Sequence, residues 1–372
     1  MKQLYLFQLG RDPELSRIEI ESFLELLNKK FEIIETSKNI TIVSTENLDK
    51  DIIKKLGGTI KISEVISNSG RIPDIEENLA KQEFYTGTKN KAYYSVQGYQ
   101  TGLTDLVIQI IKDYFKKIKI KATIKKEIEP SAMIKKDFLE SGVDILIYKN
   151  YIARTIAVTN PLETKERDLS RPNVDYMKTI SIRLAKILIN LSQVKKGGIL
   201  IDPFCGSGTI LQEAMLNGIN TIGLDKDPES IKQSKDNLEW AKEQYKLDSS
   251  YQLYKLDSRK MTSVIKTADA IVTEPYMGPY IRKLPTIKEA QELADELTSL
   301  YIAVIKQSEK IIKKGNRVVI IIPRIRTREN KNVLININSV IENTSLRKVY
   351  PAIIYAYKKS KLHREIYVLE KH

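Results

Sequence analysis

The chain has 372 residues, with 61 lysines and arginines against 47 acidic residues and a formal net charge of +14. One cysteine and two histidines exclude a disulfide scaffold, a multi-thiolate zinc site and a Ser–His relay, and leave little for a histidine-based metal site. No apolar run is long enough for a transmembrane helix, and the N-terminus lacks the features of a signal peptide. We expect a cytoplasmic protein of two or three domains that binds no metal or membrane and has a polyanionic partner.

The positive charge is concentrated after residue 111. Residues 1–111 contain 14 basic and 16 acidic residues, whereas residues 112–372 contain 47 and 31. The densest stretch, residues 112–136, has nine lysines and three acids. Such lysines can simply form a solvated helix face, but no later segment balances the excess. Nucleic acid is the simplest partner, because lysines that neutralise phosphates release counterions.

Residues 1–75 are predicted to form an N-terminal α+β domain. Leu4 to Leu9 is typical of a strand, and Asp12-Pro13-Glu14 begins an amphipathic helix that continues through Leu27. A second strand is expected at Ile40 to Val43, and Gly57-Gly58 marks a break.

Residues 76–160 are predicted to form a second α+β domain, followed by a linker over 161–176. Strands are expected at Ala92 to Val96 and Val143 to Tyr148, separated by a helix that begins at Thr104 and runs into the lysines. A hairpin turn at Asn150-Tyr151 leads to a return strand that ends at Val158.

Residues 177–372 alternate strands and helices, which predicts a doubly wound, mostly parallel sheet with helices on both faces. Strands are expected at 198–202, 221–225, 251–256, 268–273 and 317–322, the last of them stopped by Pro323. Helices are expected at 209–216, from an N-cap at Asp227-Pro228, and at 287–312. Strands near 352–357 and 365–369 would close the chain as an antiparallel pair.

A glycine loop connects the first strand and helix of this α/β segment. A phosphate loop requires a lysine after Gly208, and a dinucleotide loop requires a third glycine where Leu211 stands, so the loop fits neither pattern. The sequence of the loop, residues 202–209, resembles the first motif of S-adenosylmethionine-dependent methyltransferases. We assign its members to the cofactor site: Asp202, Pro203, Phe204, Cys205, Gly206, Ser207, Gly208 and Thr209.

Acidic residues follow the next two strands. Asp225 comes about 20 residues after the glycine loop, where an acid can bind both ribose hydroxyls, and Lys226 is assigned to the same site. Asp257 is expected to accept a hydrogen bond from the adenine amino group, with the Ser258 backbone nearby. Asp202 can orient the loop and meet the cofactor's ammonium through water. Each aspartate alone could be a turn or cap residue, but together they indicate a cofactor site.

Glu274, Pro275 and Tyr276 follow the fourth strand, at the edge where open α/β sheets bind substrate. They resemble the [D/N]-P-P-[Y/F] motif of methyltransferases that act on exocyclic amines of nucleobases. Such an amine is a poor nucleophile; an acceptor side chain and a strand-end carbonyl can bind its hydrogens and direct its lone pair at the methyl group. An aromatic side chain can stack on the extruded base.

The motif differs from this pattern in two places. Glu274 replaces Asp or Asn, and Tyr276 stands where the second proline belongs, so either Tyr276 or Met277 takes the aromatic position. Attack on pyrimidine C5 is excluded, because that chemistry needs a cysteine nucleophile and Cys205 lies in the cofactor loop.

The whole chain resembles the tRNA guanine-10 N2-methyltransferases, which join an N-terminal domain and a THUMP RNA-binding domain to a Rossmann-like methyltransferase. Gln8 to Ser16 is similar to the family's opening motif, and 93–158 to a THUMP core. Arg167 to Pro172, Met177 and Leu184-Ala185 resemble the start of its catalytic domain. The resemblance implies an S-adenosylmethionine-dependent enzyme that methylates guanine N2 at position 10 of tRNA. Separately, we expect a monomer.

RNA contacts are assigned to lysines of the second domain and to one arginine beyond it, with one RNA lying across both domains. These residues are Lys112, Lys116, Lys117, Lys135 and Arg171. The alternatives are methylation of another exocyclic amine in rRNA or tRNA, and an inactive RNA-binding protein that still binds the cofactor. A DNA methyltransferase is the least favoured, since no separate sequence-reading domain is evident.

Overall fold

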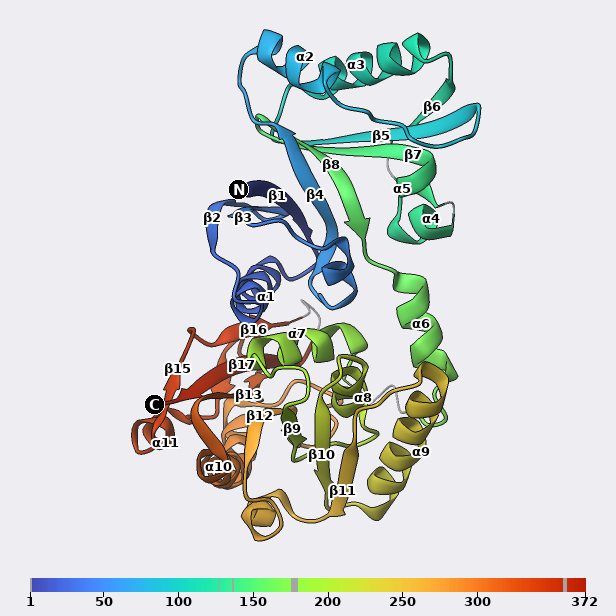
Figure 1. Ribbon diagram of the computed structural model, residues 1–372. Helices are drawn as coiled ribbons and strands as arrows, with labels where there is room; N and C mark the ends of the chain where they lie inside the picture. The colour runs from blue at the N-terminus through green and yellow to red at the C-terminus, as the bar shows by residue number, and fades with distance from the viewer. Residues whose placement is uncertain (1, 127, 136, 175–179, 357–359) are drawn as a thin grey trace. The chain divides into compact units, whose positions relative to one another are not determined.

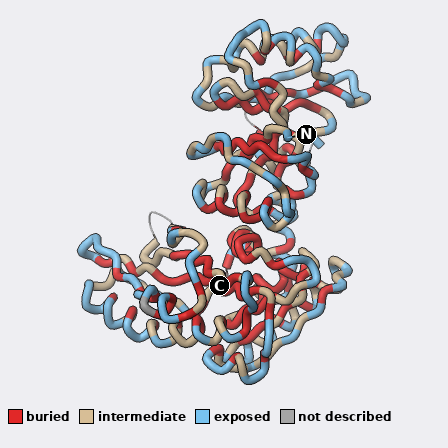
Figure 2. Tube along the Cα trace, turned by 60° about the vertical axis from the view of Figure 1, so that its left-hand side comes forward, coloured by how far each residue is buried: buried red, intermediate tan, exposed pale blue. Residues whose placement is uncertain are grey.

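The computed structural model describes residues 2–126, 128–135, 137–174, 180–356 and 360–372. It divides into two compact units. The first unit contains Met1–Arg17 and Leu27–Glu166, and the second contains Ile18–Leu26 and Arg167–His372. In both, buried residues follow the strands of a sheet (Figure 2). The predicted positions of Met177 and Tyr357 lie outside the described residues.

The first unit contains one eight-stranded sheet in the order β2-β3-β1-β4-β8-β7-β5-β6 (Figure 1). Its strands are β1 (Gln3–Leu9), β2 (Phe31–Thr36), β3 (Ile40–Thr45), β4 (Thr59–Ser67), β5 (Lys91–Tyr99), β6 (Lys121–Lys125), β7 (Gly142–Tyr148) and β8 (Tyr151–Val158). β5 runs parallel to β6 and β7, and the other pairs are antiparallel. Pairing of β4 with β8 joins strands from both predicted N-terminal domains into one sheet.

The helical elements in this part of the chain are α1 (Pro13–Leu26), η1 (Lys50–Lys54), α2 (Ile72–Ala80), α3 (Thr104–Lys117), α4 (Pro130–Lys135), α5 (Phe138–Ser141) and α6 (Pro161–Ser170). α2 and α3 pack on β5, β7 and β8 through a shared apolar core (Figure 1). In α3 this apolar face consists of Val107, Ile111 and Phe115. Their i, i+4, i+8 spacing puts the lysines of α3 on the opposite, exposed face.

A buried ion pair connects β4 to β7 within this sheet. Lys61 Nζ lies 2.8 Å from Asp144 Oδ2, and both side chains are almost fully buried. The Thr155 hydroxyl donates to the same carboxylate at 2.6 Å, and the Ser95 hydroxyl donates to its other oxygen. Because removal of either partner would leave an uncompensated buried charge, breaking this pair should destabilise the sheet.

The second unit contains the predicted doubly wound sheet. Its strands are β9 (Ile199–Asp202), β10 (Asn220–Asp225), β11 (Tyr251–Lys255), β12 (Ala268–Thr273), β13 (Ile312–Arg326), β14 (Asn332–Leu334), β15 (Leu346–Lys348), β16 (Ile353–Tyr355) and β17 (Leu362–Lys371). The central order is β11-β10-β9-β12-β13-β17-β15, with β14 beside β13 and β16 beside β17. β9 to β13 are parallel, and β17 is antiparallel to β13.

Helices cover both faces of this sheet, as predicted (Figure 1). They are α7 (Ile182–Ser192), α8 (Thr209–Leu216), α9 (Pro228–Tyr245), η2 (Ser258–Ser263), α10 (Ile287–Ile311) and α11 (Asn338–Glu342). α10 packs on one face through Ala294, Tyr301 and Ile305, against Ile271 and Val318 of the sheet. Its first turn has a capping box between Thr286 and Glu289, which explains why the helix begins there.

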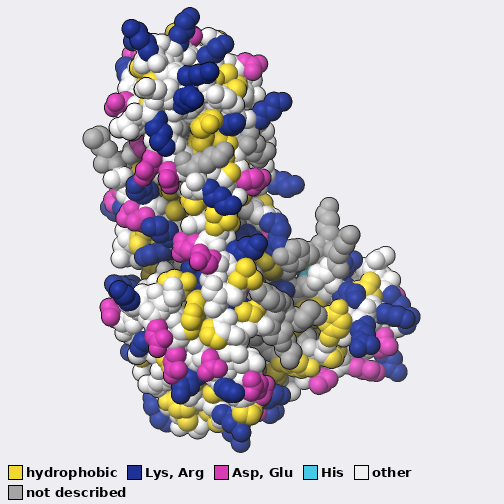
Figure 3. Space-filling view, turned by 90° about the vertical axis from the view of Figure 1, so that its right-hand side faces the viewer, with side chains coloured by type: hydrophobic (Ala, Val, Ile, Leu, Met, Phe, Trp, Pro, Cys, Tyr) yellow, Lys and Arg dark blue, Asp and Glu magenta, His cyan; other side chains and the backbone are white. Residues whose placement is uncertain are grey.

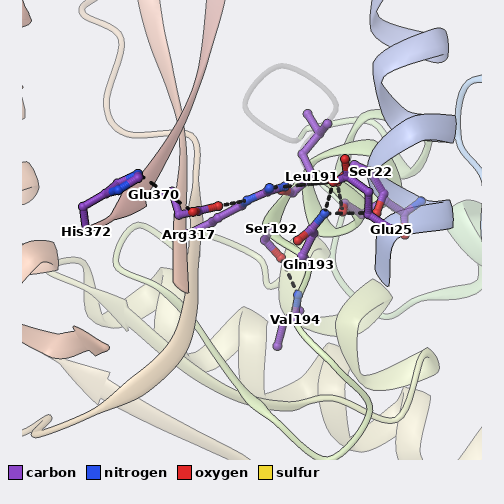
Figure 4. Close-up of polar contacts among 10 residues, drawn as sticks. Ser22, Glu25, Leu191, Ser192, Gln193, Val194, Arg317, Glu370 and His372 are labelled. Atoms are coloured by element: carbon purple, nitrogen blue, oxygen red, sulfur yellow. Dashed lines mark hydrogen bonds and ion pairs between the residues drawn. The ribbon is translucent and has the colours of Figure 1, made fainter. Parts of the chain in front are cut away.

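Residues Ile18–Leu26 of α1 belong to the second unit, although we expected them in the N-terminal domain. Buried Arg317 of β13 donates to the Ser22 hydroxyl and to the Leu191 carbonyl, each at 3.4 Å, and to Glu370 at 2.9 Å (Figure 4). Gln193 donates to Glu25 at 2.5 Å. This end of α1 therefore contributes polar partners to the core of the second unit.

The predicted end of a strand at Pro323 is wrong. β13 continues through Pro323 to Arg326 and pairs with β17 along its whole later half. On the other side, pairing with β12 ends at Ile320 and pairing with β14 begins at Arg324. Pro323 thus occupies a gap between two partner strands, where its missing N–H is tolerated.

Candidate active site

The glycine loop and the Glu274 segment lie where the strand order of the second unit reverses. β9 pairs with β10 on one side and with β12 on the other, so the connections after β9 and β12 lead in opposite directions across the sheet. The carboxyl ends of parallel strands at such a switch point form the usual ligand crevice of an open α/β sheet. The two predicted halves of the site are therefore adjacent in the fold.

The glycine loop requires glycine at two positions. Gly206 and Gly208 have φ values of +50° and +84°, which other residues rarely adopt. A Cβ atom at Gly208 would also lie 2.6 Å from the Ser234 hydroxyl oxygen. The Gly206 N–H donates to Asp225 Oδ2 at 3.1 Å, which fixes the loop to the end of β10. This compact loop, with room above Gly206 and no Cβ in the way, fits close approach of a ligand.

Asp202 is buried beneath the loop. Its Oδ1 accepts hydrogen bonds from the Thr273 hydroxyl at 2.7 Å and from the Phe204 N–H at 3.1 Å. Burial, with smaller contributions from the negative charges of Asp225 and Glu274, raises the pKa of the Asp202 carboxyl to about 7. Three carboxyl groups therefore share this edge of the sheet, which suits a ligand that carries positive charge.

Asp225 is held from both sides of its carboxylate. Oδ2 accepts from the Gly206 N–H, and Oδ1 accepts from the Asp227 N–H at 2.9 Å. Asp225 is half-buried and Lys226 is exposed. The carboxylate is thus positioned at the end of β10 as expected, and its contact with ribose stays a prediction.

Asp257 has a partner that the sequence did not indicate. The Arg259 side chain donates to both of its oxygens, at 2.5–3.0 Å, and these bonds lower the pKa of Asp257 to about 2. Asp257 also accepts from the Arg259 N–H as the N-cap of η2, and Ser258 is buried. A bond to adenine stays a prediction, and it requires Arg259 to share the carboxylate.

Glu274 follows β12 directly and is only 13% exposed. The Nε of Arg364, from β17, donates to Glu274 Oε1 in a close ion pair. The arginine was missed from the sequence because it lies 90 residues away, and the pattern of β17 does not show which residue faces the site. The carboxylate is therefore fixed at the sheet edge by a neighbouring strand.

The backbone after Glu274 is also fixed. Pro275 is buried, and the Tyr276 carbonyl accepts from the buried Tyr301 hydroxyl at 3.2 Å. Gly278 has φ +97° and packs against Leu293. The Tyr276 side chain is 51% exposed, whereas Met277 is half-buried. Of these two residues, Tyr276 is thus the more exposed, and its stacking on a base stays a prediction.

Two further residues hold the glycine loop and were not predicted. Thr273 binds Asp202, as described above. Buried Asn237 of α9 donates to the Ser207 carbonyl and to the Asn173 carbonyl, each at 2.9 Å. Thr273 could have been found as the residue before Glu274, whereas Asn237 has no distinguishing sequence signal.

Arg171 does not lie on the surface, in contrast to the expectation for a phosphate contact. It is 4% exposed, and its guanidinium donates to the Thr209 hydroxyl at 2.6 Å and pairs with Asp168 at 2.7 Å. Nearby, buried Arg167 pairs with Glu213 of α8 at 3.0 Å. These contacts fix the segment before the catalytic domain to the helix that follows the glycine loop, and no contact of Arg171 with RNA is available in this arrangement.

The other predicted RNA contacts are exposed. Lys112, Lys116 and Lys117 lie on the outer face of α3, and Lys135 is at the end of α4. Lysine and arginine side chains are prominent at the helical end of the first unit, at the top of Figure 3. Their binding of RNA stays a prediction.

The described part of the chain shows neither a group of side chains placed to hold a metal ion nor a helix that could span a membrane. Within those residues, no group of three or more His, Cys, Asp or Glu side chains is placed to hold a metal ion. No described helix is long and apolar enough to span a bilayer.

Two family models match the chain. Residues 173–333 match one described as an RMKL-like methyltransferase domain, and this range contains the glycine loop, Asp225, Asp257 and Glu274. Residues 77–236 match one described as a DNA methylase, and this range stops before β12.

Curated relatives match most of the chain. It is 26% identical over 307 residues to a tRNA (guanine(10)-N2)-dimethyltransferase from Methanocaldococcus jannaschii, with 77% of this chain and 86% of the relative covered. It is 25% identical over 267 residues to the enzyme of the same name from Methanothermobacter thermautotrophicus, with 72% and 75% covered.

Among solved structures, TrmN from Thermus thermophilus has a TM-score of 0.52 at 14% identity, with 99% of this chain and 100% of that chain covered. At this identity the likeness concerns the fold. The predicted S-adenosylmethionine-dependent methyltransferase fold is confirmed. Residues 173–333 match the RMKL-like methyltransferase domain, and the chain is a homologue of archaeal tRNA (guanine(10)-N2)-dimethyltransferases.

Proposed function

We propose that this chain methylates the exocyclic N2 amine of a guanine in tRNA, at position 10, with S-adenosylmethionine as methyl donor. The main support is the placement of Glu274 and Tyr276 beside the glycine loop, Asp202 and Asp225 at one switch point. The names of the two curated relatives support tRNA as the substrate and guanine N2 as the target. We further propose that the protein works as a cytoplasmic monomer without a metal ion.

The cofactor would be held by the glycine loop and the aspartates at the strand ends. Gly206 and Gly208 carry no Cβ atom, Asp225 would bind the ribose, and the Asp202 carboxyl, which becomes negatively charged near pH 7, would face a cationic group. S-adenosylmethionine supplies an electrophilic methyl group on a sulfonium.

The amine needs activation, because its lone pair is delocalised into the base. The Glu274 carboxylate and a backbone carbonyl of the segment that follows β12 are the acceptors for its two N–H groups. These bonds localise the lone pair and hold the nitrogen in line for attack. Positive charge that develops on the nitrogen is stabilised by the carboxylate, and exposed Tyr276 stacks on the extruded base.

Exposed lysines of α3 and α4 would position the RNA. Lys112, Lys116, Lys117 and Lys135 can neutralise phosphates, which sets orientation and affinity but carries no base specificity. RNA affinity should therefore fall steeply as the salt concentration rises, and replacing the three α3 lysines should reduce that salt dependence.

Product analysis tests the proposed function directly. Purified protein is incubated with tRNA and radiolabelled S-adenosylmethionine, and the RNA is digested to nucleosides. Labelled N2-methylguanosine or N2,N2-dimethylguanosine supports the proposal and also distinguishes one transfer from two. Absence of labelled methylguanosine on every tRNA tested would contradict it.

The departure from the [D/N]-P-P-[Y/F] pattern supports two alternatives. Another labelled nucleoside, such as N6-methyladenosine, would indicate a different exocyclic amine, and labelled rRNA would indicate a different RNA. An inactive protein is indicated if calorimetry shows cofactor and RNA binding without turnover, and Glu274→Ala changes neither affinity.

A further inference from the structure

We propose that Arg364 is a positioning residue for methyl transfer, which fixes the Glu274 carboxylate so that one oxygen accepts a hydrogen bond from the substrate amine. This inference rests on the proposed function, because it assigns the amine to Glu274. It also explains how a glutamate can work where related motifs have a shorter acidic or amide side chain.

The fold brings Arg364 to the reactive edge. β17 runs antiparallel to β13, with Arg364 opposite Pro323, and β12 runs parallel to β13, with Thr273 opposite Ile320. The position opposite Arg364 on β13 is therefore three residues closer to the carboxyl end of that strand than the position opposite Thr273. Thr273 directly precedes Glu274. The β13 strand lies between β12 and β17, so the arginine side chain reaches the carboxylate across that strand.

The contact uses one side of the carboxylate. Arg364 Nε donates to Glu274 Oε1, and no described residue donates to Oε2. The glutamate side chain is 13% exposed and that of the arginine 31%, so the pair is shielded without being cut off from a ligand. This arrangement leaves Oε2 as the oxygen for the substrate amine.

Glutamate needs such a partner more than aspartate does. It has one more rotatable bond, and a free carboxylate would sample several positions relative to the cofactor. A misplacement of about 1 Å can cost roughly 100-fold in rate. A charge-assisted bond from a planar guanidinium fixes both distance and direction.

Other charged groups face Glu274. The negative charge of Glu274 contributes to the raised pKa of buried Asp202 and to that of the buried Tyr301 hydroxyl. Asp202 lies at the end of β9, and Tyr301 lies on α10. If either group lost its proton, its negative charge would repel the Glu274 carboxylate. Among the described residues, Arg364 is the cationic side chain that forms an ion pair with Glu274. Its positive charge offsets the local excess of negative charge.

The experiment compares four variants with wild type: Arg364→Gln, Arg364→Lys, Glu274→Gln and the double Gln variant. Single-turnover rates are measured with saturating tRNA and cofactor, and dissociation constants are measured separately. Arg324→Gln is the matched control, since Arg324 of β13 pairs with Glu365 of β17 at 2.9 Å and is 25% exposed. It removes a similar ion pair from the same two strands without touching Glu274.

We expect Arg364→Gln to lower the single-turnover rate about 10- to 100-fold while both dissociation constants stay within about threefold. Arg364→Lys should recover part of the rate, because the charge remains but the planar fork is lost. The double variant should be no more than about threefold slower than Glu274→Gln, since the two residues act as one unit. Arg324→Gln should keep the wild-type rate.

Three results would overturn the proposal: a wild-type rate in Arg364→Gln, multiplicative losses in the double variant, or an equal loss of tRNA affinity. The last would make Arg364 an RNA contact. A wild type that forms no methylguanosine would instead contradict the proposed function. A crystal structure of Arg364→Gln tests positioning independently of turnover: a displaced Glu274 carboxylate supports it, and an unchanged one contradicts it.

Discussion

The two halves of the site are built in different ways. The cofactor half includes short-range contacts: the Phe204 N–H donates to Asp202 within one loop, and the Gly206 N–H donates to Asp225 at the end of the next strand. The acceptor half depends on Arg364, which comes from a strand near the end of the chain. Local contacts leave a readable motif in the sequence, whereas a distant partner can compensate for a motif that has changed.

Removal of the Glu274 charge tests the acceptor half and should have the largest effect. Glu274→Gln keeps the shape and a hydrogen bond to Arg364 but loses the negative charge that stabilises the amine. We expect the single-turnover rate to fall about 100- to 1,000-fold with tRNA affinity nearly unchanged. Equal losses in rate and tRNA affinity would show that Glu274 acts in binding.

Asp202 tests whether a buried carboxyl group in the cofactor half lowers the stability of the folded protein. The unfolded carboxyl loses its proton near pH 3.8, whereas the folded one keeps it to about pH 7. The contribution of Asp202 to the stability of the wild-type protein without cofactor should therefore fall as the pH rises from 4 to 7. Asp202→Asn retains acceptors for Thr273 and Phe204, so above pH 7 it should be more stable by a few kcal/mol.

Thermal unfolding at pH 5 and pH 8 checks this prediction. The melting temperature of Asp202→Asn should exceed that of wild type by more at pH 8 than at pH 5. A constant difference between the two proteins would mean that the Asp202 carboxyl titrates normally in the folded state. The variant should also bind the cofactor more weakly, since the negative charge near its cationic group is lost.

Asp225 tests the local construction of the cofactor half. Asp225→Ala removes the expected ribose acceptor together with the bonds to the Gly206 and Asp227 N–H groups. Loss of a charged acceptor should weaken cofactor binding about 10- to 100-fold, as measured by calorimetry. Asp225→Asn keeps one acceptor oxygen and should lose less; unchanged affinity in both would mean that the ribose lies elsewhere.

Gly208 provides the smallest and most local test. Gly208→Ala combines a left-handed backbone with a Cβ atom 2.6 Å from the Ser234 hydroxyl oxygen. We expect about a 10-fold loss of cofactor affinity. Gly197→Ala is the matched control, because Gly197 has φ +82° but open space around its Cβ position. Equal effects in the two variants would assign the loss to backbone strain and not to the loop's packing.

Much of the second unit could be predicted from its sequence. The ranges of α8 and β12 and the N-cap at Asp227 agree with the prediction, because apolar periodicity and capping residues act over a few residues. The first unit was harder to predict. β2 and β4 were missed, and β4 carries polar and charged residues, including Lys61, that only their sheet partners make compatible with burial.

Arg171 and Pro323 show the same limit. A basic residue near the start of the catalytic domain was expected to contact RNA, but the fold buries it against Thr209. A proline was expected to end β13, but it falls in a gap between two partner strands. In both cases the prediction rested on the residue type alone. The surroundings that decide its role come from segments far away in the sequence.

The sequence by itself determined the doubly wound sheet, the glycine loop, the acidic strand ends and the Glu274-Pro275-Tyr276 segment. These depend on backbone preferences and on periodicities within single elements. The tertiary structure decided which residues surround each motif: Arg364 on Glu274, Thr273 on Asp202 and Asn237 on the glycine loop. Strand order and register place such partners, and these depend on pairings between residues far apart in the chain.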